Sequence, residues 1–587
     1  MPVTKYDVLI KNGLIVDGSG KPSFKGDIAV KDELIINIGD VKGDADRIID
    51  ADGLVICPGF IDAHTHADRT LPLYPNADNY VMQGVTTLVT GSCGNSIAPI
   101  LDWWPPYMRW DLDILTELKP LKYDDTWSVK ELLRVDEVKV KVKDFYNVDI
   151  IWGLFKDFLS CLEKEGISLN FVPFIGHNTV RAQVMYPDWD RGPTHEEFEK
   201  MKWLINEAME AGAFGLSTGL DFVPGRYAKT AEIIELLKIV KKFDGIYATH
   251  YRYYGTCNKR AREGILEAIE ICRHTGVKTQ LSHLRSVYNI FPKPPIELSK
   301  AVIQSSLKLI DDARDQGLDI CFDVGPRAQN TGIWTTIYLA SILIPWLRET
   351  GSRKNLSKAL RMEDFREEIK LFILSGKLRG LNPLINSNWD NEIKIAQCLN
   401  KKFLDKTIRQ ISENLKTDSF ESLFQILIID SDTIIMRTIE NNDEEKAELI
   451  KHPYCMIGLD TQAFDDKWEL KTPPYFLPHS NSYGGMSRYI RRYSREMKML
   501  TLEEAIRKIT YLPAKAFKIK NRGLLKLGAY ADIFIFDFNL ISDVEDPIDP
   551  RHYPMGTHYV FVNGELVVDK RGHKKTKPGR ILKLNEE

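Results

Sequence analysis

Two histidines separated by a single residue, His64 and His66, follow the apolar stretch of residues 58–63. On a β-strand, side chains at positions i and i+2 point to the same side, so both imidazoles can approach one metal ion. A pair of this kind is weak evidence when it stands alone, because it often occurs by chance. Its meaning depends on whether the rest of the chain supplies further metal ligands.

Four further candidate ligands each follow a short apolar run of their own: Cys93, which lies among glycines, His250, His283 and Asp460. Taken singly, each has a structural alternative as a core cysteine, a buried histidine or a turn aspartate. Imidazole, thiolate and carboxylate groups together suit zinc, with cobalt, nickel or iron as substitutes. Asp460 can also act as a general base. With the two histidines, these residues predict a metal centre that could hold one ion tightly and a second weakly.

The elements that must position these ligands are short apolar runs of the kind that form buried parallel strands. Eight such runs occupy residues 56–63, 85–91, 170–176, 213–218, 245–249, 278–282, 318–324 and 454–459. Helical spacing of apolar residues marks the intervals 196–211, 230–243, 261–274 and 301–316. Alternating strands and helices predict an α/β fold, a (β/α)₈ TIM-type barrel, with a doubly wound sheet as the alternative. A barrel enzyme carries its chemistry at the C-terminal ends of the strands, where all six candidate ligands fall.

Both ends of the chain are rich in short strands and turns. Asn12-Gly13 and Asp17-Gly18 are strong turn signals between apolar runs, and residues 531–536 and 559–568 continue this pattern near the other end. We therefore predict a composite small β-sandwich domain formed by residues 1–57 and 516–587.

The barrel domain is then expected over residues 58–515, with two insertions. Residues 101–150 form the first insertion. Residues 345–450 form the second, before the eighth strand, and their charged, helical-looking sequence is interpreted as a helical lid. The alternative for this segment is a surface insertion without a role in function.

Composition narrows the class of protein. The formal net charge of −3 gives no electrostatic reason to expect nucleic acid or an anionic membrane as a partner. The partner expected from the predicted metal centre is a small-molecule substrate. The first residues lack the features of a signal peptide, and no run of about 18 apolar residues predicts a membrane span. The eight cysteines are scattered, which is typical of a reducing, cytoplasmic setting. The sequence leaves the oligomeric state open, with a homo-oligomer as one alternative.

With these residues in place, the chain resembles the amidohydrolase superfamily and, within it, the N-acyl-D-amino-acid deacylases (D-aminoacylases), over nearly its whole length. The motifs that carry the resemblance are residues 58–66, 85–99 (VTTLVTGSCGNSIAP), 176–181 (GHNTVR), 212–220 (GAFGLSTGL), 245–252 (GIYATHYR), 457–460 and 521–532 (NRGLLKLGAYAD). The resemblance implies a zinc-binding barrel beside a small β-domain made from both termini.

The resemblance also implies a role for each ligand. Cys93 would be a metal-bridging thiolate, and His250 and His283 would complete the tightly held site. A second, weaker site would consist of His64, His66 and Asp460, with Asp460 also the catalytic acid and base. Many relatives bridge their metals with a carbamylated lysine from the fourth strand, but residues 215–218 (GLST) contain no lysine. This favours the cysteine-bridged branch over the hydantoinase-like and dihydroorotase-like branches.

Residues expected around the substrate depart from the family pattern. Arg285 stands where the family usually has lysine, and the seventh-strand Asp323 is followed by Val-Gly-Pro-Arg instead of a tyrosine-rich turn. Tyr253-Tyr254 replaces a polar Asn-Glu pair, and His479 is followed by Ser-Asn instead of Pro-Arg.

Four residues remain candidates for substrate binding. Arg285 and Arg327 could each bind a carboxylate through the planar guanidinium, with structural salt bridges as the alternative. His177 and His479 could contact the substrate or a buried neighbour.

The predicted reaction is hydrolysis of the linear amide C–N bond of an N-acyl-D-amino acid or related D-dipeptide by a zinc-activated water, with Asp460 as acid and base. One alternative is an amidohydrolase acting on a cyclic amide or another C–N bond, as in the hydantoinase-like and dihydroorotase-like branches. The other is a non-catalytic binding or scaffold protein that kept the fold. Such proteins usually lose ligands, whereas this chain has all six.

Overall fold

All eight apolar runs contain strands in the computed structural model of the chain. The structure describes residues 5–105, 132–254, 260–284, 295–327, 338–375, 384, 388–437, 443–465, 480–546 and 551–585. The barrel strands are β6 (Phe60–Asp62), β7 (Val85–Val89), β8 (Asn170–Val172), β9 (Ile175–Gly176), β10 (Gly215–Gly219), β11 (Ile246–His250), β12 (Lys278–Leu281), β13 (Ile320–Val324) and β16 (Cys455–Ile457). Nearly every residue of these strands is buried, which explains why they read as continuous apolar runs.

The strands run parallel and close into a ring. The sheets β6-β7-β8 and β9-β10-β11-β12-β13-β16 meet in the third run, which supplies β8 to one and β9 to the other. On the opposite side, the Ala63 amide donates to the Ile457 carbonyl at 3.3 Å, and Thr65 bridges to Thr461 in parallel register. These contacts join β6 to the end of β16. The predicted α/β class and the TIM-type barrel are confirmed.

Helices cover the outside of the barrel. The helices before the insertion are α1 (Asp78–Val81), α3 (Val135–Tyr146), α4 (Phe155–Glu165), α5 (His177–Met185), α6 (His195–Glu210), α7 (Thr230–Lys242), α8 (Ala261–Thr275) and α9 (Ile296–Asp315). Thr194 and Glu197 form a capping box that starts α6. Helix α9 begins five residues before the predicted 301, directly after Pro295, whose fixed φ suits the entry to a helix. After β16 come α18 (Asn481–Tyr489), the π-helix η7 (Ile490–Glu496), α19 (Leu502–Lys508) and α20 (Tyr511–Ala516).

Strands from both ends of the chain form a single sheet next to the barrel. They are β1 (Lys5–Ile15), β2 (Phe24–Lys31), β3 (Leu34–Gly39), β4 (Asp44–Asp50), β5 (Val55–Pro58), β17 (Ile533–Phe536), β18 (Thr557–Val562), β19 (Glu565–Asp569) and β20 (Gly572–His573). The two ends join where β5 pairs antiparallel with β17, with Ile56 opposite Ile535. Apolar side chains of β1–β5, β17 and β18 share one core, as the predicted small β-sandwich requires.

The first apolar run, residues 56–63, is divided between the two parts of the fold. Gly59 separates β5 in the composite sheet from β6 in the barrel. A Cβ atom at this position would lie 2.2 Å from the Thr86 side chain, so only glycine lets the chain pass so close to β7. The predicted boundary between residues 57 and 58 lies next to this glycine, although the limits of the folding units stay a prediction.

The second insertion folds around a core of its own. It contains α10 (Ile344–Thr350), α11 (Arg353–Ala359), α12 (Glu363–Leu374), α13 (Trp389–Glu392), β14 (Ile393–Gln397), α14 (Ile408–Leu415), α15 (Ser419–Ile429) and β15 (Ile434–Arg437). Its buried apolar residues, from Leu339 to Ile435, form a cluster separate from the barrel core. The segment is not purely helical, because β14 and β15 pair as an antiparallel hairpin. The predicted range 345–450 also includes α16 (Asp443–Ile450), which packs against the barrel helix α9.

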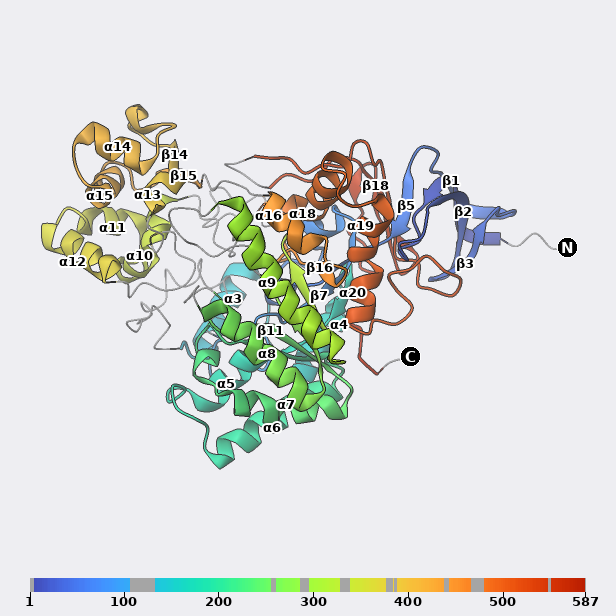
Figure 1. The fold of residues 1–587 in the computed structure, drawn as a ribbon, viewed down its shortest axis with the longest axis horizontal. Coiled ribbons are helices and arrows are strands. Elements are labelled where there is room, and N and C mark those ends of the chain that lie inside the picture. The colour runs from blue at the N-terminus through green and yellow to red at the C-terminus, as the bar shows by residue number, and fades with distance from the viewer. Residues whose placement is uncertain are drawn as a thin grey trace.

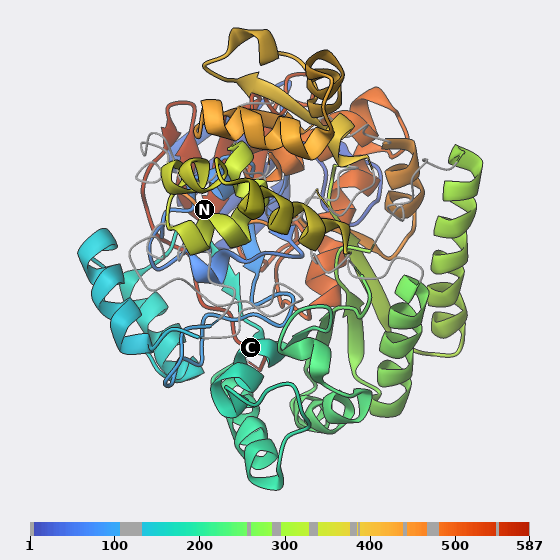
Figure 2. The same cartoon turned by 90° about the vertical axis from the view of Figure 1, so that its left-hand side faces the viewer.

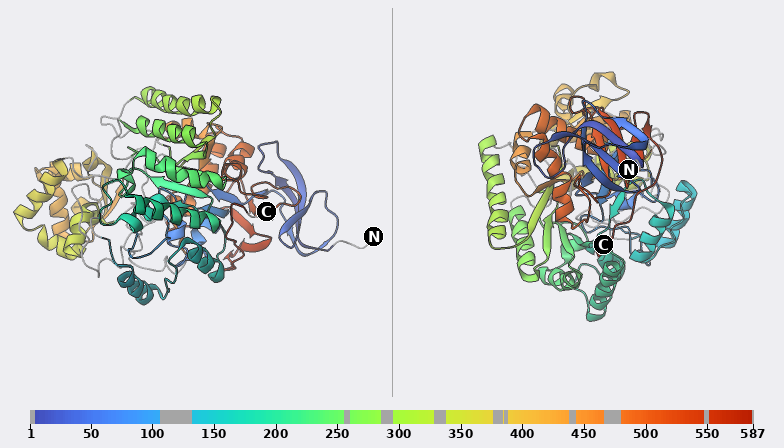
Figure 3. Two further views of the ribbon diagram at one scale, coloured as in Figure 1. Left: turned by 90° about the horizontal axis from the view of Figure 1, so that it is seen from below. Right: turned by 90° about the vertical axis from the view of Figure 1, so that its right-hand side faces the viewer.

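The three parts lie in a row, with the inserted unit at one end, the barrel in the middle and the composite sheet at the other end (Figure 1). The inserted unit covers the barrel when the molecule is viewed from one side (Figure 2), and the composite sheet covers it from the other (Figure 3). Because the chain enters the inserted unit after the C-terminal end of β13, this unit lies on the side to which the barrel strands point. Among the described residues, no helix is both long and apolar enough to cross a membrane.

A buried ion pair fastens the composite sheet to the barrel. Asp532 pairs with Arg522, and the two side chains are 4% and 2% exposed. The Asp532 carboxylate also accepts hydrogen bonds from the Asn563 amide at 2.8 Å and from the side chain of Asn170 in β8 at 3.1 Å. One carboxylate therefore links the loop before β17, the turn after β18 and a barrel strand.

We expect the substitution Asp532→Ala to destabilise the protein by about 3–5 kcal/mol, because it leaves Arg522 buried without its counter-ion. Urea unfolding followed by tryptophan fluorescence measures the change. Asp52→Ala is the matched control, since Asp52 pairs with Lys25 at the surface and is 67% exposed; its urea midpoint should match that of the wild type. Equal midpoints for both variants would contradict a structural role for the buried pair.

Candidate metal centre

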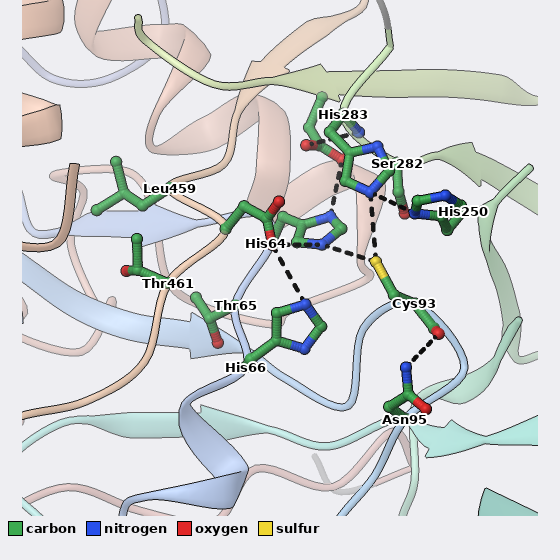
Figure 4. A network of polar contacts seen from close by, with 12 residues as sticks. His64, Thr65, His66, Cys93, Asn95, His250, Ser282, His283, Leu459 and Thr461 are labelled. Carbon is green, nitrogen blue, oxygen red and sulfur yellow. Dashed lines mark hydrogen bonds and ion pairs between the residues drawn. The ribbon is translucent and has the colours of Figure 1, made fainter. Parts of the chain in front are cut away.

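The six candidate ligands come together at the C-terminal ends of the barrel strands. Figure 4 shows the Cys93 side chain pointing toward His64 and His283, with His66 and His250 on either side of this group. Exposure is 1% for His64, 2% for His66, 4% for Cys93 and 3% for His250. The predicted constellation therefore forms in three dimensions, in a space largely closed to solvent.

Two groups of three ligand atoms are close enough to hold a metal ion. In the first, the Cys93 Sγ lies 3.3 Å from His64 Nε2 and 3.3 Å from His283 Nε2. In the second, the Asp460 Oδ1 lies 3.2 Å from His66 Nε2 and 3.6 Å from His64 Nε2. Within each group, all ligand atoms lie within 4.8 Å of one another. His64 belongs to both groups and connects them.

His250 adjoins the first group through His283. Its Nδ1 lies 2.9 Å from His283 Nε2. The resemblance assigns His250 and His283 to Cys93, whereas the closest three-atom group around the sulfur contains His64 and His283. How the six donors divide between two ions therefore stays a prediction. The donor set itself, with one thiol, imidazoles and a carboxylate, has the chemistry that zinc prefers.

Three of the six ligands adopt a backbone conformation that is rare for residues with a side chain. The φ angles of Cys93, His283 and Asp460 are +55°, +39° and +53°. Left-handed residues of this kind cost free energy and cluster at functional sites. Gly94, with a φ of +74°, continues the turn after Cys93, and a Cβ atom there would lie 2.4 Å from Asn178 Oδ1. The sequence Gly91-Ser-Cys-Gly94 is thus shaped to turn the thiol inward.

Comparison with known proteins relates this chain to the amidohydrolases. Amidohydrolase family models match residues 47–122 and 391–567. D-aminoacylase from Alcaligenes xylosoxydans xylosoxydans is 28% identical over 98% of this chain and 97% of its own length. N-acyl-D-aspartate deacylase from the same organism is 29% identical over 98% of this chain and 95% of its own. The chain is thus similar to amidohydrolases, and over almost its whole length to deacylases of N-acyl-D-amino acids.

A solved structure shows the same fold as this chain. N-acyl-D-glutamate deacylase from Bordetella bronchiseptica, crystallised with zinc and a phosphonate inhibitor, superposes with a TM-score of 0.68 at 23% identity. The match covers 99% of this chain and 100% of the deacylase. The resemblance inferred from the motifs is confirmed.

The carboxylate of Asp323, which was not among the predicted ligands, positions two of the candidate ligands. Asp323, fully buried in β13, lies with its Oδ2 3.4 Å from His64 Nδ1. Its Oδ1 accepts a hydrogen bond from the His283 amide at 3.0 Å. Metal-binding histidines are commonly oriented by a carboxylate on the second ring nitrogen. Asp323 closes the seventh apolar run, which was the signal available in the sequence.

Burial and charge together set the protonation of His64. Burial alone lowers the pKa of this imidazole, but the neighbouring charges of Cys93 and Asp323 outweigh burial and raise the pKa well above its usual value. Asp62 holds the backbone of the same residue, because its Oδ1 accepts from the amides of His64 at 3.1 Å and Leu459 at 3.0 Å. Burial raises the pKa of Asp62 to about 8, although these two amides act in the opposite direction.

The loop that carries Cys93 is held by a second aspartate. Asp68 is 2% exposed and accepts hydrogen bonds from the amides of Gly91 at 3.2 Å and Ile97 at 3.0 Å. These two amides lie on either side of Cys93 in the sequence. Burial raises the pKa of Asp68 to about 6. Asp68 stands two residues after His66, a position the sequence analysis did not single out.

The candidate substrate-binding residues that the structure describes are engaged with carboxylates. His177 Nε2 lies 2.9 Å from Glu232 Oε1, in a buried cluster that also contains Arg181. The Arg327 guanidinium pairs with Asp543 at 2.5 Å, and its side chain is 8% exposed. Arg285 and His479 lie outside the described residues. Substrate binding by these four side chains stays a prediction.

We expect Asp323→Ala to weaken zinc binding by about 10- to 100-fold, because His64 and His283 both lose the group that orients them. Competition with a chromogenic chelator measures the affinity. Asp319→Ala is the control, since Asp319 directly precedes the same strand and its side chain is 54% exposed. Unchanged affinity in Asp323→Ala would contradict the positioning role of this carboxylate.

Proposed function

We propose that this protein is a zinc-dependent amidohydrolase that cleaves the linear amide C–N bond of N-acyl-D-amino acids or related D-dipeptides. The observation that carries the proposal is the buried group of Cys93, His64 and His283 beside His66 and Asp460. The substrate class comes from D-aminoacylase and N-acyl-D-aspartate deacylase, which align with this chain over almost its full length.

The candidate ligands would have two roles, metal binding and proton transfer. Cys93, His64, His283 and the adjoining His250 would hold the tightly bound zinc, and His66 and Asp460 would complete a second, weaker site. When bound, zinc supplies Lewis acidity that makes hydroxide available near neutral pH. The protein supplies the orientation of the donors and a largely buried site.

Asp460 is the side chain best placed to move a proton. Its side chain is 19% exposed, which makes it the most exposed of the three residues in its group with His64 and His66. A carboxylate that lies against the donors and also faces solvent can take a proton from the attacking water. It can then return that proton to the nitrogen of the leaving amine.

The fourth strand favours a linear-amide hydrolase over the cyclic-amide alternative. Relatives with a bridging lysine carry it on this strand, whereas β10 presents Ser217 to the Cys93 loop. The Ser217 hydroxyl donates to the Gly91 carbonyl and accepts from the Gly94 amide at 3.0 Å. This strand therefore supports a cysteine that occupies the centre, which is the arrangement expected of the deacylase branch.

The remaining features of the proposal concern partners and location. The substrate is a small molecule. A cytoplasmic location and assembly into a homo-oligomer stay predictions from the sequence.

We expect the zinc-loaded protein to release free D-amino acid from a panel of N-acetyl-D-amino acids and to leave the matched L-substrates intact. Amine release assayed with ninhydrin, followed by chiral chromatography of the product, measures both. The absence of turnover across the D-panel in protein that contains zinc would reject this substrate class and direct attention to cyclic amides.

We expect Asp460→Asn to lower kcat by about 10²- to 10⁴-fold, because the amide cannot exchange the proton. Steady-state kinetics on the best D-substrate measures the loss. Asp319→Asn is the control, since the Asp319 side chain is 54% exposed, and its kcat should match that of the wild type. Equal turnover by Asp460→Asn and the wild type would remove Asp460 from the chemistry, whereas an unchanged low background rate in both would support a binding protein that kept the fold.

A further inference from the structure

Aromatic rings pack against two of the candidate ligands, His250 and His283. The Tyr254 ring lies 4.6 Å from the His250 ring and 4.6 Å from the His283 ring, measured between centroids. The Phe222 ring lies 4.3 Å from His250. The planes of these three pairs are inclined by 65°, 47° and 51°, within the range of tilted and edge-to-face aromatic packing.

These rings reach the histidines from separate elements. Phe222 lies in the loop after β10, and Tyr254 follows the end of β11, so each is fixed to the barrel independently. Both side chains are half-buried. His250 therefore has Phe222, Tyr254 and His283 packed against it, since the His283 ring lies 4.5 Å away.

Tyr253, which precedes Tyr254 in the sequence, packs against a different partner. Tyr253 has a φ of +65°, which turns the chain so that two consecutive tyrosines face different partners. The Arg260 guanidinium stacks on the Tyr253 ring at 3.9 Å. Tyr254 alone of the two contacts the histidines, which provides a matched pair of residues for comparison.

We propose that Tyr254 and Phe222 form an aromatic clamp, defined by these two residues, that holds the imidazoles of His250 and His283 in the orientation for metal binding and slows release of the ion. The proposal rests on the metal centre of the proposed function. An imidazole must rotate away from the ion before the ion can leave, and rings packed against it oppose that rotation. The clamp gives His250 and His283 the fixed orientation that His64 receives from Asp323.

The clamp acts through ring packing and not through the tyrosine hydroxyl. Phenylalanine at position 254 should therefore preserve it, whereas alanine should remove contacts to both histidines at once. Alanine at position 222 should remove the contact to His250 alone and have the smaller effect. Tyr254 and Phe222 are positioning residues in this scheme, because they act through the ligands and not on the reacting atoms.

Transfer of zinc from the loaded, full-length protein to an excess of 4-(2-pyridylazo)resorcinol tests the proposal. We expect Tyr254→Ala to release zinc about 10-fold faster than the wild type, Phe222→Ala about 3-fold faster, and Tyr254→Phe at the wild-type rate. Tyr253→Ala should also match the wild type. Urea midpoints equal to that of the wild type show that each variant is folded.

The outcomes separate this inference from the proposed function, because the assay uses no substrate. Wild-type release rates in Tyr254→Ala overturn the clamp and leave the deacylase proposal intact. Rapid release from Tyr254→Phe also overturns it, since the hydroxyl would then be the working group. A chain that binds no zinc overturns both the metal centre and the clamp, whereas a clamp effect in a protein without deacylase activity supports the clamp and overturns only the substrate class.

Discussion

The Cys93 sulfur lies 3.3 Å from imidazole nitrogens of two residues that belong to different barrel strands, in a space almost closed to solvent. That approach requires the strands that precede His64 and His283, and the loop that carries the cysteine, to be held in fixed positions relative to one another. The closure of β6 onto β16 fixes the first strand, since the Asp460 amide donates to the His64 carbonyl at 2.9 Å. The contacts of Asp323 then set His64 relative to His283.

Three buried carboxyl groups support the residues around this sulfur. Asp62 and Asp323 are fully buried and Asp68 nearly so, and all three hold backbone or imidazole groups of the centre. Burial opposes ionisation of such carboxyl groups, as the raised pKa values of Asp62 and Asp68 indicate. A divalent cation among the ligands would favour the ionised forms and would invert this local balance.

Much of the fold and the ligand set could be predicted from the sequence, because two physical rules leave clear traces. Buried parallel strands read as apolar runs, and a barrel brings the C-terminal ends of those runs to one place. His250, which ends β11, illustrates how a ligand can be located from its run alone.

The same rules say nothing about features that depend on contacts distant in sequence. The run 56–63 is apolar throughout, so periodicity could not show that it passes from one sheet to another at Gly59. Arg327 pairs with Asp543, 216 residues away, and no local signal separates such a pair from a substrate-binding arginine. The β14–β15 hairpin consists of two very short strands within a charged, mainly helical segment, and helical spacing around it conceals it.

Because β5 pairs with β17, the composite sheet can be completed only late in the synthesis of this protein. Strands β1 to β5 leave the ribosome first, but β17 emerges only after the whole barrel has been made, on the order of a minute later at typical elongation rates. During that interval the edge of β5 has no β17 to pair with, and open strand edges invite association with other chains. The β5 edge is therefore paired only in chains that have been translated as far as β17.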